Sequence, residues 1–144
     1  MTLHLLNIFE YYDQDVMLQI LYDLLSERDP VANISHKRMP NFDEHVAFVR
    51  SNPYSYWWLI LAYGMGVRPT VYGACYISKQ NEIGIQLFKV HQGNGVARAA
   101  LAELLRMFPE QRLLANVAPR NEKSRRLFEA AGFALCQYTF ERTA

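Results

Sequence analysis

One stretch of the chain decides the fold, and it reads Glu82-Ile83-Gly84-Ile85-Gln86-Leu87-Phe88-Lys89-Val90-His91-Gln92-Gly93-Asn94-Gly95-Val96-Ala97. Its first six residues alternate between apolar and other side chains, which is the period of a β-strand with two different faces. Residues 98–106 are nearly all strong helix formers, so we expect a helix from the end of the stretch to about Phe108. The stretch is therefore predicted to run from a strand, through a loop with two glycines, into a helix.

The loop between this strand and helix is a predicted anion site. Gly93 and Gly95 carry no side chain, so the backbone there can turn sharply and approach a ligand closely. The first amides of a helix have no partner within it and lie at the positive end of the helix dipole. A phosphate or pyrophosphate suits such a site. A tight turn that only caps the helix is the alternative, since a short glycine pattern is weak evidence by itself.

Two motifs in this region resemble those of one known family. The loop sequence Gln92-Gly93-Asn94-Gly95-Val96-Ala97 resembles the Gln/Arg-x-x-Gly-x-Gly/Ala signature of the GNAT superfamily of N-acyltransferases. The segment from Asn121 to Phe133 is similar to the downstream GNAT pattern Asn-x-x-Ser/Ala-x-x-x-Tyr/Phe-x-x-x-Gly-Phe. Other phosphate loops fit less well, because no lysine follows Gly95 and no suitable third glycine follows Ala97. The two GNAT motifs stand in the family's order.

The resemblance implies that acetyl-coenzyme A binds at the loop as the acyl donor, with no metal. The backbone of Phe88 and Val90 would be free to pair with the pantetheine arm of the cofactor. The pyrophosphate would lie on the loop, whose candidate binding residues are Gln92, Gly93, Asn94, Gly95, Val96 and Ala97.

The second motif would contribute further contacts to the cofactor. Asn121 and Ser124 match positions that contact the arm or the adenosine part in the family. Four positive charges near one helix could meet the remaining phosphate, and they belong to Arg120, Lys123, Arg125 and Arg126. A solvated basic helix face is the alternative for at least two of these four.

Acyl transfer to an amine also requires a proton acceptor. A lysine-like ammonium has a pKa near 10.4, so neutralising it at pH 7 costs about 4 kcal/mol unless a base assists. Glu82 is the first candidate for this base, because it begins the strand that leads into the loop and some family members carry a glutamate near this point. An exposed carboxylate at a strand end is the alternative. His36 and His45 are secondary candidates from the N-terminal elements.

The general acid of the family is missing from its usual position. Many members place a tyrosine in the second motif to reprotonate the leaving thiolate, and this chain has Phe128 there. The acid is therefore absent, supplied by another residue such as Tyr138, or replaced by water. This departure favours an alternative from another class, a non-catalytic sensor of acyl-coenzyme A.

Composition limits the class of protein. A chain of 144 residues, of which 51% are hydrophobic, predicts one domain over residues 1–144 with a substantial core. The net charge of +1 argues against a nucleic-acid partner, and neither a signal peptide nor an apolar run of membrane-spanning length is found. Cys75 and Cys136 lie in apolar, strand-like runs, so we expect buried thiols in a reducing cytoplasm.

The remaining elements predict an α+β fold with a mixed, mainly antiparallel central sheet flanked by helices. The expected order is β-α-α-β-β-β-α-β-α-β, as in the GNAT family. Strands are expected at 3–9, 54–63, 71–78, from residue 82, at 112–117 and at 133–142, and helices after Asp13, over 41–50, up to Phe108 and within 119–132.

Two of these helices carry recognisable caps. Asp13 is expected to cap the first, whose apolar stripe is Met17, Ile20, Leu21, Leu24 and Leu25. Asn41 with Glu44 three residues later predicts a capping box for the second. That helix is expected to bury Phe42, Val46 and Val49. Residues 26–40 read as a long loop.

The function predicted from these observations is transfer of an acetyl group to a primary amine. The acceptor is expected to lie against residues 28–58, a segment that mixes aromatic residues with His36, Lys37, Arg38, His45 and Arg50. An amino sugar, free or nucleotide-linked, is the first candidate, and a protein N-terminus or a small metabolite is the alternative.

We also predict a homodimer. The expected final strand has neither charge nor proline between Phe133 and Phe140, and no further strand follows it to form a hairpin. Its outer edge would therefore present unpaired amides and carbonyls. Two copies would meet along this edge or through the aromatic surface near Tyr54 to Trp58.

Overall fold

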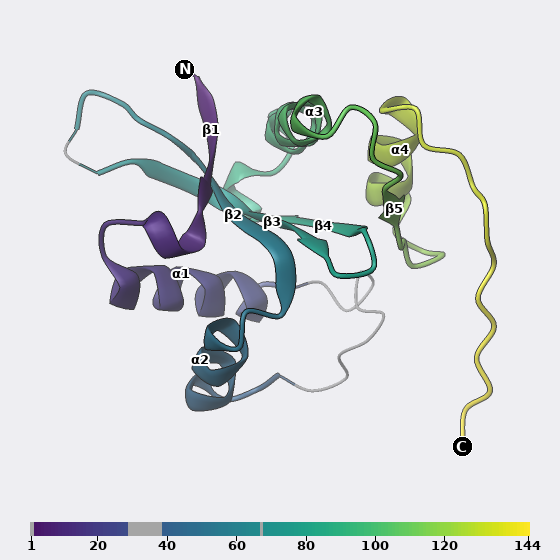
Figure 1. Cartoon of the computed structure of the whole chain (residues 1–144), viewed down its shortest axis with the longest axis horizontal. Helices are drawn as coiled ribbons and strands as arrows, with labels where there is room; N and C mark the ends of the chain where they lie inside the picture. Colours follow the sequence, from purple (N-terminus) through teal and green to yellow (C-terminus); the bar gives the residue numbers. More distant parts are fainter. Residues whose placement is uncertain (1, 29–38, 67) are drawn as a thin grey trace.

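The computed structural model describes residues 2–28, 39–66 and 68–144 of the chain. The strands are β1 Leu3–Asn7, β2 Tyr54–Ala62, β3 Thr70–Ser78, β4 Glu82–Leu87 and β5 Leu114–Ala115. The helices are α1 Gln14–Ser26, α2 Phe42–Arg50, α3 Val96–Met107 and α4 Glu122–Ala130, with short 3₁₀ turns at Ile8–Glu10 and Lys89–His91. The predicted fold class is confirmed: α1 and α2 cover one face of a central sheet, and α3 and α4 cover the other (Figure 1).

The sheet has five strands in the order β1-β2-β3-β4-β5. The first three pairs are antiparallel, and β4 and β5 are parallel. A parallel pair needs a crossover connection, and α3 supplies it. The parallel pairing is short, because it joins only Glu82 to Leu114 and Ile83 to Ala115.

Both predicted helix caps are confirmed. The side chain of Asp13 accepts a hydrogen bond from the backbone N–H of Val16 at 3.1 Å. Asn41 Oδ1 accepts from Glu44 N at 2.8 Å, and Glu44 Oε1 accepts from Asn41 N at 2.9 Å, which completes the capping box. These bonds satisfy amides that a helix leaves unpaired at its start.

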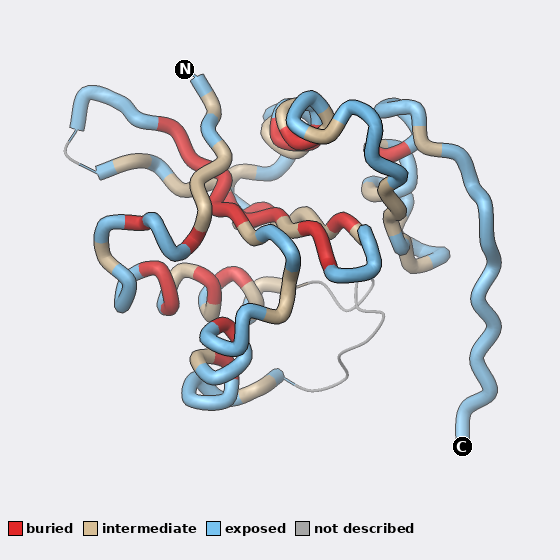
Figure 2. Tube along the Cα trace, in the orientation of Figure 1, coloured by how far each residue is buried: buried red, intermediate tan, exposed pale blue. Residues whose placement is uncertain are grey.

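The core has two parts, one on each face of the sheet. On the α1/α2 face, Met17, Leu21 and Leu24 pack with inward residues of β2 such as Leu59. On the α3/α4 face, the buried residues are Trp58, Ile60, Cys75, Ile77, Ile83, Leu87, Ala100, Leu101, Leu104 and Phe128. Figure 2 shows this burial running along the central strands and the inward sides of α1 and α3.

The prediction of a final strand over 133–142 is wrong for the single chain. Residues 134–144 form no strand, and all of them are exposed as the segment leaves the body beyond α4 (Figures 1 and 2). An extended segment without a partner strand has no backbone hydrogen bonds to stabilise it as a strand. Cys136 is consequently exposed, against our expectation of a buried thiol, whereas Cys75 is buried. The strand expected at 112–117 is also shorter, at two residues.

Candidate active site

The glycine loop has the backbone geometry expected of it. Gly93 and Gly95 have φ values of 84° and 78°, in the left-handed region that favours glycine. Gly95 is the N-cap of α3, and no side chain caps this helix. The first amides of α3 are therefore available to an anion. A Cβ at either glycine would meet nothing within 4 Å, so backbone conformation rather than space requires glycine here.

Gln92 fixes the start of this loop to the end of β4. Its Nε2 donates to the carbonyl oxygen of Leu87 at 3.2 Å. Asn94, Gly95 and Val96 line one side of a cavity of about 190 Å³, and Leu3, Ala62, Tyr72 and Ala99 complete its walls. Val96 and Ala97 are half-buried and pack against the core on the α3/α4 face. The predicted loop residues thus lie together at the start of α3.

The edge of β4 that faces β5 is open beyond Ile83. Pairing with β5 ends at that residue, and within the described part of the chain no other strand pairs with this edge from Gly84 to Leu87. The backbone of Phe88 differs from our expectation, because its N–H donates to Tyr72 O and its carbonyl accepts from His91 N, both at 2.9 Å. The Phe88 carbonyl is therefore hydrogen-bonded to the 3₁₀ turn that follows β4. Val90 is 78% exposed within the turn.

Glu82, the candidate base, is held at the start of β4. It is half-buried, and it lies on the α1/α2 face because it alternates with Ile83, which belongs to the opposite core. Asn116 Nδ2 donates to Glu82 Oε2, and the hydroxyl of Ser78 lies 3.4 Å from Glu82 Oε1. The backbone N–H of Glu82 donates to the hydroxyl oxygen Oγ of Ser78 at 3.0 Å. The carboxylate is thus positioned between β3 and the residue that follows β5.

An aromatic wall lies beside Glu82 on the same face of the sheet. The rings of Tyr54 and Tyr76 stack at 3.9 Å, with Trp57 edge-on to Tyr54 at 4.7 Å. Tyr76 lies directly over Gly84, where a Cβ would meet the ring at 2.2 Å. Burial is the main reason that the pKa of Tyr54 is well above its usual value, and the neighbouring Tyr76 raises this pKa further. Tyr76 is not among the predicted site residues, although a glycine inside a strand signals such a close approach.

The histidine and tyrosine candidates lie elsewhere. His45 is buried on α2, only 5% exposed and 5.4 Å from the ring of Tyr22, and this burial lowers its pKa. Phe42, which we expected to be buried on this helix, is instead 38% exposed. Tyr138 is 74% exposed on the C-terminal segment, so the structure does not bring it to Glu82. His36, Lys37 and Arg38 lie outside the described residues.

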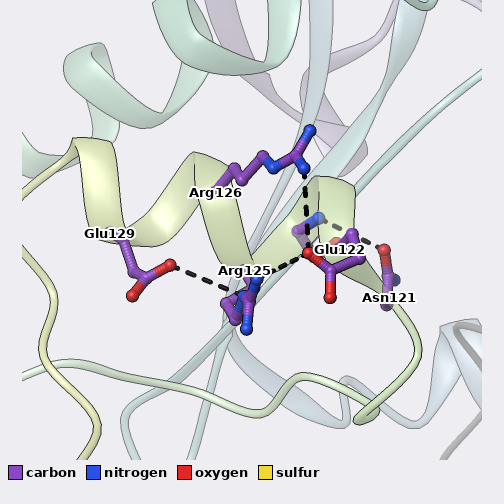
Figure 3. Close-up of polar contacts among 6 residues, drawn as sticks. Asn121, Glu122, Arg125, Arg126 and Glu129 are labelled. Atoms are coloured by element: carbon purple, nitrogen blue, oxygen red, sulfur yellow. Dashed lines mark hydrogen bonds and ion pairs between the residues drawn. The ribbon is translucent and has the colours of Figure 1, made fainter.

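The second motif forms the start of α4. Asn121 caps this helix, its Oδ1 accepting from the half-buried Ser124 through the backbone N–H at 3.2 Å. Arg125 lies between two carboxylates, 2.6 Å from Glu122 and 3.6 Å from Glu129, and Arg126 approaches Glu122 at 3.9 Å (Figure 3). We predicted that the positive charge of Arg125 would meet a phosphate, but carboxylates of the same helix already balance it.

Phe128 is buried and packs edge-on against Phe133, with ring centroids 5.2 Å apart. The position that carries the family's tyrosine therefore belongs to the core. A hollow of about 350 Å³ separates α4 from α3, lined by Arg98, Leu101, Ala102, Leu105, Leu127, Ala130 and Ala131. Arg98 places a cation there, close in sequence to the glycine loop.

Comparison with known proteins identifies the family. Residues 8–134 match the family model described as an acetyltransferase (GNAT) domain, so the chain belongs to the GNAT acetyltransferases. No curated protein matches the chain significantly.

Solved structures share its fold at low sequence identity. A domain from Methanocaldococcus jannaschii is 20% identical with a TM-score of 0.77, over 97% of this chain and 93% of that one. A putative acetyltransferase from Salmonella typhimurium, solved with its cofactor acetyl-CoA, is 18% identical with a TM-score of 0.62, over 92% and 79%. Spermidine N-acetyltransferase from Vibrio cholerae, solved with CoA and spermine, is 19% identical with a TM-score of 0.63, over 92% and 80%.

Among residues 2–28, 39–66 and 68–144, the structure contains no helix that is both long and apolar enough to span a membrane.

Proposed function

We propose that the protein transfers an acetyl group from acetyl-coenzyme A to the primary amine of a small acceptor. One observation carries the proposal: β4 joins the candidate base to the candidate anion site and leaves an open edge between them. Glu82 and Leu87 are separated by about 17 Å along the strand. The pantetheine arm is an extended chain of comparable length, and its two amides suit an open strand edge. Pyrophosphate on the first amides of α3 would then bring the thioester toward Glu82.

The chemistry of the step assigns a role to Glu82. The neutral amine nitrogen attacks the thioester carbonyl, a C–N bond forms, and the C–S bond breaks to release the coenzyme A thiolate. Glu82, directly or through a water molecule, takes the proton that the amine loses. Asn116 and Ser78 hold the carboxylate in place. Water returns a proton to the thiolate in this proposal, because Phe128 has no hydroxyl and Tyr138 lies on the exposed segment.

The acceptor would lie on the α1/α2 face, beside Glu82. The stacked rings of Tyr54 and Tyr76 give this face a flat apolar wall next to a carboxylate. A sugar ring can pack on such a wall while its amino group reaches the carboxylate, so an amino sugar remains our first candidate. Polyamines belong in the test as well, because a structural neighbour is a spermidine N-acetyltransferase.

The test measures coenzyme A release with a panel of amino sugars, polyamines, small amines and peptides. Glu82→Gln should lower kcat by about 100-fold or more at pH 7, the usual range for losing a general base. The loss should shrink as the pH rises, since more of the amine is then already neutral. Acetyl-coenzyme A affinity should stay near normal. Glu110→Gln is the matched control, because Glu110 is an exposed carboxylate beyond α3.

Two outcomes would overturn parts of the proposal. A loss of the same size at every pH would assign Glu82 a structural role. Coenzyme A binding without turnover on any amine would favour the alternative, a non-catalytic sensor of acyl-coenzyme A. The buried Phe128, which lacks the hydroxyl of a tyrosine, also favours that alternative.

A further inference from the structure

Asn81 ends the turn between β3 and β4 and has a left-handed backbone, with φ of 62°. A hairpin loop of three residues, here 79–81, commonly needs this conformation at its last position. Glycine adopts it without strain, and asparagine is one of the few other residues that tolerate it. Asparagine also carries a side-chain oxygen that glycine lacks. The residue at this position can therefore bind a neighbouring segment as well as close the turn.

Ser78, at the end of β3, holds this turn from within. It is buried, and its Oγ accepts hydrogen bonds from the backbone N–H groups of Gln80 at 3.2 Å and Glu82 at 3.0 Å. The Ser78 carbonyl accepts from the N–H of Asn81 at 3.0 Å. These three bonds fix the direction in which the turn presents the oxygen atoms of Asn81.

Both oxygen atoms of Asn81 contact the chain that enters β5. The backbone carbonyl accepts from the N–H of Leu114 at 2.9 Å, and Oδ1 accepts from Gln111 Nε2 at 2.8 Å. β5 is joined to β4 by only two residue pairs. The contacts of Asn81 therefore supply a large part of the attachment of β5 to the sheet (Figure 1).

The position of β5 matters because the next residue reaches the candidate base. Asn116 directly follows β5, and its Nδ2 donates to Glu82 Oε2. On the other side of the carboxylate, the Ser78 hydroxyl lies 3.4 Å from Glu82 Oε1. A displacement of β5 would carry Asn116 with it and remove one of these two contacts. The carboxylate could then rotate out of the orientation that proton transfer requires.

We propose that Asn81 is a positioning residue for the candidate base, because it holds β5 where Asn116 contacts the Glu82 carboxylate. This role rests on the proposed function, in which Glu82 takes the proton of the amine. The contacts that lead from Asn81 through β5 to Glu82 exist in the protein without substrate, so they can be tested without turnover.

The first experiment is NMR spectroscopy of the protein without cofactor, with circular dichroism to check folding. Asn81→Val places a β-branched residue where the backbone is left-handed, which disfavours the observed turn. The amide of Leu114 should then exchange with solvent about tenfold faster, because it loses its hydrogen bond to the carbonyl of residue 81. The side-chain amide signal of Asn116 should move toward that of a solvated asparagine.

Three further variants separate the role of Asn81 from a general loss of stability. Asn81→Asp tolerates the left-handed backbone and keeps an acceptor oxygen, so both signals should stay as in the original chain. Asn81→Gly suits the turn and removes only the contact with Gln111, so it should move both signals in the same direction but less. Asn52→Val is the matched control, because Asn52 is also exposed and left-handed, with φ of 53°, but precedes β2. It should leave both signals unchanged.

The second experiment measures kcat at saturating acetyl-coenzyme A. Asn81→Val and Asn116→Ala should each lower kcat on the order of tenfold, less than Glu82→Gln, because the base is displaced rather than removed. The double variant should be no slower than Asn116→Ala, since both substitutions act through the same contact. The KM for acetyl-coenzyme A should change little, and Asn81→Asp should keep kcat near that of the original chain.

An Asn116 signal that stays unchanged in Asn81→Val, or in Asn81→Gly should the valine variant not fold, would overturn the positioning role. Losses in kcat that multiply in the double variant would also overturn it. A failure of the proposed function looks different, because the signals of Leu114 and Asn116 would change as expected while the original chain acetylates no amine. That result would support the contacts and overturn only the reaction.

Discussion

His45 has a buried ring nitrogen without a hydrogen-bond partner. Its Nε2 is the one buried side-chain nitrogen or oxygen among the described residues that lacks such a partner. The ring packs against Tyr22 of α1, and its own helix begins at the capping box of Asn41 and Glu44. A buried polar atom without a partner costs about 1–3 kcal/mol. The structure therefore places a destabilising group between α1 and α2.

This histidine should make the folded state sensitive to acid. Burial lowers the pKa of His45 below the value of 6.5 that the residue has in an unfolded chain. As the pH falls below 6.5, the unfolded chain binds a proton that the folded chain resists, so the free energy of unfolding decreases. His45→Leu should raise that free energy by about 1 kcal/mol at pH 7.5 and by more at pH 5.5.

Urea unfolding at the two pH values measures this difference. His4→Gln is the control, because it removes a histidine that is exposed on β1. A variant at His45 that loses stability equally at both pH values would show that the imidazole makes a favourable interaction.

At the scale of the elements, the loop before α3 owes its shape to two glycines. Gly95→Val forces a β-branched residue into the left-handed region, at a cost of about 1–2 kcal/mol, and points a side chain toward the open space beside the first amides of α3. We expect at least a tenfold loss of coenzyme A affinity in a chain that remains folded. A tenfold loss corresponds to about 1.4 kcal/mol.

Gly132 provides a matched control for this variant. It also has a positive φ, of 95°, and a Cβ added there would meet nothing within 4 Å, but it follows α4 rather than the loop. Gly132→Val should therefore carry a similar backbone cost while calorimetry finds normal coenzyme A binding. Equal affinity in the two variants would contradict the assignment of the loop.

Local signals explain which elements could be predicted from the sequence. The caps at Asp13 and Asn41, the alternation of 82–87 and the two loop glycines each act within a few residues, and the structure contains all of them. The stacking of Tyr76 on Gly84 and the contact of Asn116 with Glu82 join different elements. No local pattern encodes such contacts.

The strand predicted for the C-terminal segment also depends on a contact with another element, which the local pattern does not provide. Its alternation predicts a strand, and that prediction is wrong, because a strand needs a neighbour and none pairs with this segment among the described residues. His45 was missed as a core residue because a polar side chain at a helical position is usually assigned to solvent. Here α1 covers it.

At the scale of the whole molecule, the order of the strands affects how the chain folds. β2, β3 and β4 follow one another along the sequence and pair with their immediate neighbours through short connections. β1 ends at Asn7 and must close a long loop, containing α1 and α2, before it meets β2. β5 pairs with β4 only after α3 has crossed over. Closing long loops costs more conformational entropy than forming hairpins.

The three consecutive strands should therefore form the folding nucleus and resist opening longest. In hydrogen exchange of the native protein, the amides of Leu59, Ile60 and Cys75 should exchange only through global unfolding. The amides of β5 should exchange through a local opening of lower free energy, since only two residue pairs hold that strand. β5 borders the open edge of β4 on which the cofactor is proposed to lie. This side of the proposed site would then open and close while the rest of the sheet stays intact, giving a long cofactor a way in without unfolding the protein.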